Sequence, residues 1–141
     1  MFKYLLSIIC LAVIFIGCAA KDTPRGVTME FVGSVIEDDS LAIERLLDID
    51  LMVERRMRVI PPTDSTQTHE YFRDTIMRNL TGDGGTRAYW KEMRLVVNEE
   101  KIEGDTAFVE LTLMDQETGS IQYLTVSLYR SATGWRVFQF L

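Results

Sequence analysis

Apolar residues in the first half of the chain recur at intervals of three and four. Between residues 24 and 38 they form one stripe, made up of Val27, Phe31, Val32, Val35 and Ile36. This spacing predicts an amphipathic helix that buries one face. Thr23-Pro24 fits its start, as an N-cap followed by proline at the first helical position.

Polar breaks then separate further helical segments. Asp38-Asp39-Ser40 ends the first helix and offers an N-cap for a second, whose apolar positions are Leu41, Ile43, Leu46 and Leu47. A third segment is predicted over residues 51–59, before Pro61-Pro62 ends it, because proline cannot continue a helix.

Residues 63–68 are polar and predict a loop before one more helix. That helix is expected to begin near His69 and to stop at Thr81-Gly82, since glycine suits the left-handed conformation at a helix end. Gly82-Asp83-Gly84-Gly85 then predicts a flexible connection. It follows a helix and carries no lysine, unlike a phosphate-binding loop.

Beyond residue 85 the helical period gives way to alternation of apolar and polar residues, which is typical of strands with one buried face. Turn signals that contain Gly104, Gly119 and Gly134 separate four such runs. The pattern predicts an α+β fold, in which the N-terminal helices pack on a four-stranded antiparallel meander. The expected core-facing residues include Met93, Leu95, Val97, Ala107, Val109, Leu111, Leu113, Leu124, Val126, Leu128, Trp135, Val137 and Gln139.

This order of elements resembles the nuclear transport factor 2-like (cystatin-like, SnoaL-like) superfamily. The segments that carry the resemblance are the hairpin Glu103-Gly104-Asp105-Thr106-Ala107-Phe108-Val109 and the strand opening Gly134-Trp135-Arg136-Val137. Within the superfamily, the opening residues 24–47 are most similar to small bacterial lipoproteins with a domain of unknown function labelled lumazine-binding-like. The resemblance covers residues 23–141 and implies one domain, with a curved, cone-like sheet and an apolar cavity at its open end. It transfers no activity, because the fold serves enzymes, binding modules and dimerisation domains alike.

The N-terminus carries an apolar run over residues 4–17 that follows Lys3 and ends at Cys18. Fourteen residues suit the apolar region of a signal peptide, whereas a membrane-spanning helix needs about 20. The segment Phe15-Ile16-Gly17-Cys18-Ala19 resembles the lipobox of bacterial lipoproteins, although Phe15 stands where that family usually has leucine. An uncleaved anchor and an ordinary signal peptide with an incidental Cys18 are the alternatives.

The lipobox implies that residues 1–17 are a signal peptide, that Cys18 carries lipid and that residues 18–22 form a short tether. The expected location is the bacterial cell envelope, and Ala19 after the cysteine favours the outer membrane where the cell has one. Cys10 would leave with the leader, so the mature domain would have no thiol chemistry. Loss of Lys3 leaves 14 basic against 21 acidic residues, which changes the formal net charge from −6 to −7. Such an acidic chain disfavours nucleic acid as a partner.

Catalytic residues, metal ligands and cofactors are not expected. The single histidine, His69, is not part of a zinc-binding HExxH motif, because Arg73 stands where the second histidine would be. The expected core-facing strand positions carry no carboxylate that could act as an acid or base. The acidic pairs Asp38-Asp39 and Glu99-Glu100 are expected to be solvated.

The sequence thus predicts a non-enzymatic envelope lipoprotein that binds a protein partner or a small apolar ligand, and a degenerate enzyme of the same fold is the remaining alternative. For a ligand inside the cone, the candidate residues are Tyr89, Trp90, Met93 and Trp135, although plain core packing also explains them. For a homodimer or an envelope partner, the candidate surface is the second sheet face, with Tyr123, Thr125, Ser127 and Tyr129. An ordinary solvent-facing sheet is the alternative there.

Overall fold

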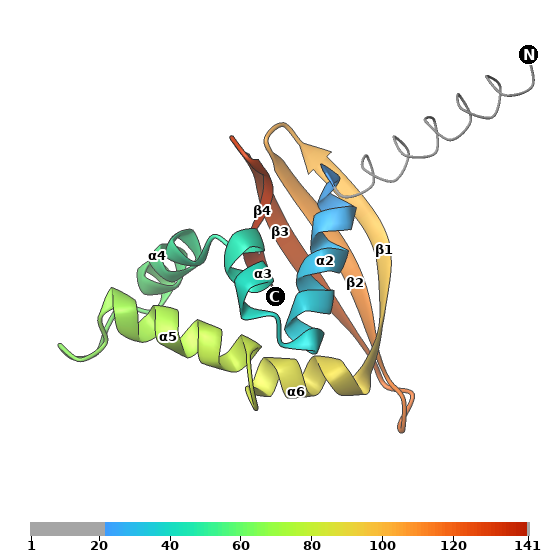
Figure 1. Cartoon of the computed structure of the whole chain (residues 1–141), viewed down its shortest axis with the longest axis horizontal. Coiled ribbons are helices and arrows are strands. Elements are labelled where there is room, and N and C mark those ends of the chain that lie inside the picture. Colours follow the sequence, from blue (N-terminus) through green and yellow to red (C-terminus); the bar gives the residue numbers. More distant parts are fainter. Residues whose placement is uncertain (1–21, 141) are drawn as a thin grey trace, which may run out of the picture.

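The structure, a computed structural model, describes residues 22–140 as helices packed on a single antiparallel sheet (Figure 1). The predicted leader over residues 1–17, the predicted lipidation residue Cys18 and most of the predicted tether lie outside the described residues. The helices are α2 (Pro24–Glu37), α3 (Ser40–Leu46), α4 (Ile49–Val59), α5 (His69–Leu80) and α6 (Gly85–Glu92). The strands are β1 (Met93–Glu103), β2 (Thr106–Asp115), β3 (Ile121–Ser131) and β4 (Gly134–Phe140).

The sheet has the strand order β1-β2-β3-β4, with every neighbouring pair antiparallel. The predicted α+β meander is therefore confirmed. Gly104, Gly119 and Gly134 lie at the three hairpin turns with positive φ angles of 62°, 70° and 119°. Glycine adopts this backbone region without the steric cost that a β-carbon brings.

Two irregularities in the ladder interrupt the regular pairing of the sheet. In β1 the register with β2 shifts between Val97 and Glu100, and in β4 Phe138 is an extra residue opposite β3. Such bulges bend a strand and increase its twist. The β4 bulge also corrects the sequence prediction, because the alternation breaks there and Phe140, rather than Gln139, pairs with the core residue Val126.

Helix α2 lies along the sheet and provides the central part of the core (Figure 1). Its N-cap is Thr23, whose hydroxyl accepts a hydrogen bond from the backbone N–H of Gly26, as the sequence predicted. Phe31 is fully buried and contacts the rings of Trp90 and Phe140, with centroid distances of 6.1 and 5.8 Å. Burial of a side chain of this size stabilises the fold by about 1.5–3 kcal/mol.

Helix α6 was not predicted, because its eight residues are too few to show a helical period and its N-cap, Gly84, makes no side-chain capping bond. The expected flexible connection before it is instead a tightly packed corner. A β-carbon on Gly84 would lie 2.2 Å from the carbonyl oxygen of Arg78. Asp38, at the end of α2, binds the same corner by accepting a hydrogen bond from the N–H of Gly82 at 2.8 Å.

Other boundaries differ from the sequence prediction by small amounts. Helix α4 begins at Ile49, two residues earlier than expected, and Leu41 of α3 is 78% exposed instead of facing the core. Across residues 22–140, none of the helices combines the length and the apolar character needed to cross a membrane.

Candidate functional site

An open cavity of about 510 Å³ lies between α4, α5, the start of α6 and the end of β4. Cavities of about 300–1,000 Å³ with mainly apolar walls are typical small-molecule sites. Here the walls are mostly apolar, and the charged groups among them are two arginines. The lining residues are Met52, Arg55, Arg56, Val59, Ile60, Ile76, Asn79, Leu80, Thr86, Phe138, Gln139 and Phe140.

Helix periodicity explains how α4 and α5 can line a cavity and still pack on the domain. In α4, Val53 is fully buried, while its neighbour Met52 is half-buried and lines the cavity. In α5, Ile76 and Leu80 are four residues apart and so lie on the same face of the helix. On the sheet side, Phe138, the extra residue of β4, is part of the lining.

The two arginines of the lining are neighbours on α4 and contact different aromatic rings. The guanidinium carbon of Arg55 lies 4.8 Å from the ring centroid of Phe138 on β4. That of Arg56 lies 5.6 Å from the ring centroid of Phe72 on α5. Successive residues of a helix project about 100° apart, so the two side chains reach the two elements that flank α4.

The four predicted ligand residues are not gathered at this cavity, and none of them lines it. Trp90 is buried and contacts the ring of Phe140 at 5.7 Å, while Trp135 is buried beneath the guanidinium of Arg130 at 4.8 Å. Tyr89 is half-buried, and its hydroxyl donates to Gln122 Oε1 at 2.7 Å. Met93 is half-buried at the edge of the core. Their role as ligand contacts stays a prediction.

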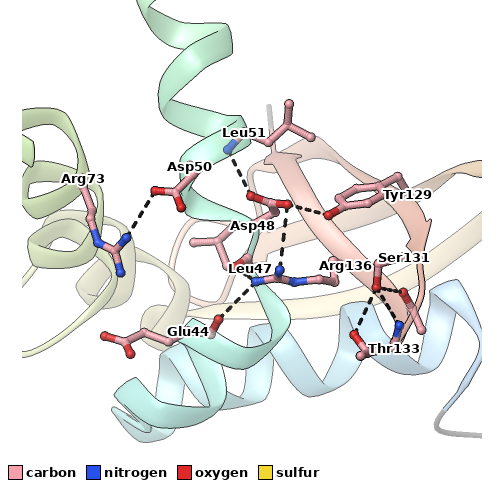
Figure 2. A network of polar contacts seen from close by, with 11 residues as sticks. Glu44, Leu47, Asp48, Asp50, Leu51, Arg73, Tyr129, Ser131, Thr133 and Arg136 are labelled. Atoms are coloured by element: carbon pink, nitrogen blue, oxygen red, sulfur yellow. Dashed lines mark hydrogen bonds and ion pairs between the residues drawn. The ribbon is translucent and has the colours of Figure 1, made fainter. Parts of the chain in front are cut away.

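Asp48 forms the centre of a polar network where α4 begins beside β4 (Figure 2). Its carboxylate caps α4 by accepting from the N–H of Leu51 at 3.0 Å, and it also accepts from the Tyr129 hydroxyl at 2.5 Å. Arg136 approaches the same carboxylate at 3.9 Å and donates to the carbonyl oxygen of Leu47 at 2.8 Å. The backbone N–H of Asp48 donates to the carbonyl oxygen of Val137 at 2.7 Å.

The pKa values of this pair fit a structural role. Partial burial raises the pKa of Asp48, but the hydrogen bonds from Tyr129 and Leu51 and the charge of Arg136 outweigh it and hold the pKa below the ordinary 3.8. The hydrogen bond to Asp48, together with burial, raises the pKa of Tyr129. The carboxylate therefore stays ionised and the phenol stays a neutral donor at physiological pH. Such a pair holds α4 on the sheet.

The predicted partner face is divided between two environments. Tyr123 is 69% exposed and Thr125 is also exposed, whereas Ser127 is buried and Tyr129 belongs to the Asp48 network. The exposed part continues into apolar residues on neighbouring strands, because Val96 and Tyr123 both flank Thr112 in the register and Met114 pairs with Ile121. The outer-face patch thus consists of Val96, Met114, Ile121 and Tyr123.

His69 lies outside the cavity lining, with its side chain 45% exposed and its Nε2 4.0 Å from Asp50. Asp50 also accepts a hydrogen bond from Arg73 at 3.2 Å (Figure 2). Over residues 22–140, no three or more histidine, cysteine, aspartate or glutamate side chains are grouped closely enough to hold a metal ion.

Asp48→Ala should destabilise the domain more than Asp39→Ala does. Asp39 is the matched control, because its side chain caps α3 by accepting from the N–H of Ala42 but makes no hydrogen bond or ion pair to the sheet among the described residues. Loss of either cap should cost about 0.5–2 kcal/mol of the free energy of unfolding. Asp48→Ala should cost about 1 kcal/mol more, because Tyr129 and Arg136 lose their shared partner. Urea titration measures both changes, and equal losses would contradict a structural role beyond capping.

The stability of the wild-type protein relative to Asp48→Asn should depend on pH. Because the folded-state pKa of Asp48 is lowered, its ionised form stabilises the folded state fully above the ordinary pKa of 3.8. That advantage should disappear as the pH falls through the lowered folded-state value. Urea titrations of both proteins across the acidic range measure the difference, and a constant difference would contradict this assignment.

The fold is similar to that of a solved Campylobacter jejuni protein that is named as a nuclear transport factor 2-like (NTF2-like) transpeptidase. The two structures superpose with a TM-score of 0.54 over 82% of this chain and 96% of that chain, at 16% sequence identity. No protein-family model matches the chain, and no curated protein matches it. At this identity the likeness concerns the fold alone: the described domain has an NTF2-like fold.

Proposed function

We propose that this protein is a lipid-anchored module of the bacterial cell envelope that binds a small apolar ligand without transforming it. The observation that carries the binding function is the cavity between α4, α5 and β4, with its volume of about 510 Å³ and its mainly apolar lining. The anchor rests on the lipobox-like segment around Cys18 and on the resemblance of residues 24–47 to lumazine-binding-like lipoproteins. Ala19 favours the outer membrane in a diderm cell.

The polar groups of the cavity support binding rather than catalysis. They are the side chains of Asn79, Thr86 and Gln139 and the guanidinium groups of Arg55 and Arg56. Amides and hydroxyls orient a ligand by hydrogen bonds, and a guanidinium stays protonated and so does not act as a base. The Campylobacter jejuni neighbour is named for a transpeptidase, but its fold is the only property that 16% identity carries over.

Cys18→Ser should release the protein from the membrane fraction, because the acyl chains provide the attachment in this proposal. Cell fractionation with mass spectrometry of the mature chain is the measurement. The wild type should carry a lipid mass on an N-terminal Cys18, and Cys10→Ser should behave like the wild type. Retention of residues 1–17 in the wild-type chain would instead support an uncleaved anchor.

Asn79→Trp should weaken ligand binding, because the indole would occupy the cavity from an exposed position on α5. Asp74→Trp is the matched control, since Asp74 is exposed on the same helix and does not line the cavity. The measurement is the fluorescence of the neutral probe N-phenyl-1-naphthylamine with the full chain in phosphatidylcholine nanodiscs, after subtraction of empty discs. Saturable binding that both variants retain would contradict this site.

The outer-face patch favours a second function, which is self-association or docking of an envelope protein. Ile121 and Tyr123 on β3 are 52% and 69% exposed, and Val96 on β1 is 43% exposed. Met114 on β2 lies between these two strands on the same sheet face. Such contiguous exposed apolar residues often mark interaction surfaces. The patch and the cavity share no residue, so both functions are compatible.

Tyr123→Glu should convert a dimer into a monomer, because it places a charge in the centre of the patch. Static light scattering of a soluble version that begins at Lys21, at high micromolar concentration, is the measurement. Tyr71→Glu is the control, since Tyr71 is 48% exposed on α5, away from the sheet. A wild-type monomer that Tyr123→Glu leaves unchanged would contradict the homodimer.

A further inference from the structure

The charge of the cavity lining is opposite to that of the chain. The chain has 21 acidic and 15 basic residues, yet the charged residues of the lining are Arg55 and Arg56, and none is acidic. Local positive charge on an acidic protein attracts anions to one place and repels them from most others. The cavity therefore combines apolar walls with a preference for negative charge.

The two guanidinium groups are positioned but not neutralised. Each lies over an aromatic ring, Arg55 over Phe138 and Arg56 over Phe72. Among residues 22–140, neither forms an ion pair with a carboxylate, whereas Arg58 on the same helix pairs with Glu54 at 3.7 Å. Stacking on a ring leaves the edge of a guanidinium, with its N–H donors, free for a carboxylate or a phosphate.

The apolar part of the cavity continues from these cations in two directions. Ile76, Leu80 and Phe140 line it toward the core. Val59 and Ile60, which are 80% and 54% exposed, extend the apolar surface at the end of α4. A ligand that contacts the apolar walls and also pairs with the two guanidinium groups must have an apolar chain and an anionic end.

We infer that the cavity binds the free monomer of a single-chain anionic amphiphile, such as a fatty acid or an alkyl phosphate, with its head group between Arg55 and Arg56 and its chain along the apolar wall. This inference rests on the proposed ligand-binding function and specifies the ligand class. The two guanidinium groups supply charge-assisted hydrogen bonds to the head group. The apolar chain supplies the burial that drives association.

The test uses the full chain in neutral phosphatidylcholine nanodiscs, with 11-(dansylamino)undecanoic acid as the probe. Energy transfer from tryptophan reports binding, because Trp90 contacts Phe140, which lines the cavity. Dodecanoate and dodecanol compete with the probe, and they differ in the charge of the head group but not in chain length. Dodecanoate should displace the probe at about tenfold lower concentration than dodecanol, as expected for hydrogen bonds to charged groups.

Substitution of the arginines should remove this preference. In the Arg55→Gln/Arg56→Gln double variant, the two competitors should act within about threefold of each other. Arg58→Gln, the matched control on the same helix, should keep the wild-type preference. The Arg55→Lys/Arg56→Lys double variant should keep part of the preference, because lysine retains the charge but not the planar guanidinium. This variant distinguishes the effect of charge from a loss of folding.

Two results would overturn the inference while the proposed function stands. One is equal competition by dodecanoate and dodecanol in the wild type, with saturable binding of N-phenyl-1-naphthylamine intact. The other is loss of energy transfer when phosphatidylglycerol is included in the discs, because bilayer lipid would then be the occupant. Absence of binding of the neutral probe would overturn both the inference and the proposed function.

Discussion

The hydrogen bond from the backbone N–H of Asp48 to the carbonyl oxygen of Val137, 2.7 Å long, fixes the part of the molecule on which the cavity depends. It joins the chain between α3 and α4 to the free edge of β4, where Leu47 forms an isolated parallel bridge with Val137. The Asp48 side chain caps α4 at the same place, so one residue fixes both the position and the start of that helix. Because α4 is one wall of the cavity, its position at the sheet edge determines the shape of the site.

The opposite wall depends on the extra residue in β4. Without the bulge at Phe138, strict alternation would place Gln139 on the same face as Val137 and move Phe140 away from Phe31. The bulge instead lets Phe140 complete the aromatic contacts with Phe31 and Trp90, while Phe138 lies against the guanidinium of Arg55. One inserted residue thus allows Phe140 to pack in the core while Phe138 lines the cavity.

The features that the sequence predicted are those that local residues determine. The Thr23 cap, the apolar stripe of α2 and the glycine turns of the meander each follow from a few neighbouring residues, and the structure confirms them. The cavity depends on contacts between residues far apart in the chain, so no local pattern indicates it. Arg55 and Arg56 look like the solvated face of an amphipathic helix until α5 and β4 are placed beside them. The start of α4 could have been predicted from the sequence, because aspartate is a favoured N-cap residue and Asp48 directly precedes Ile49, where the helix begins.

The site lies between two helices that bury fewer residues than α2 does, as expected for helices that line a cavity. Helix α2 buries seven residues, whereas α4 buries only Ile49 and Val53 and α5 buries Phe72, Ile76 and Leu80. Atoms that line a cavity lack partners on one side and lose part of their dispersion energy. An apolar ligand that fills the space restores those contacts and stabilises the folded state by mass action. Ligand binding should therefore stabilise α4 and α5 more than α2 and the sheet. The reason is that the ligand contacts side chains of α4 and α5 that have no protein partner on the side of the cavity.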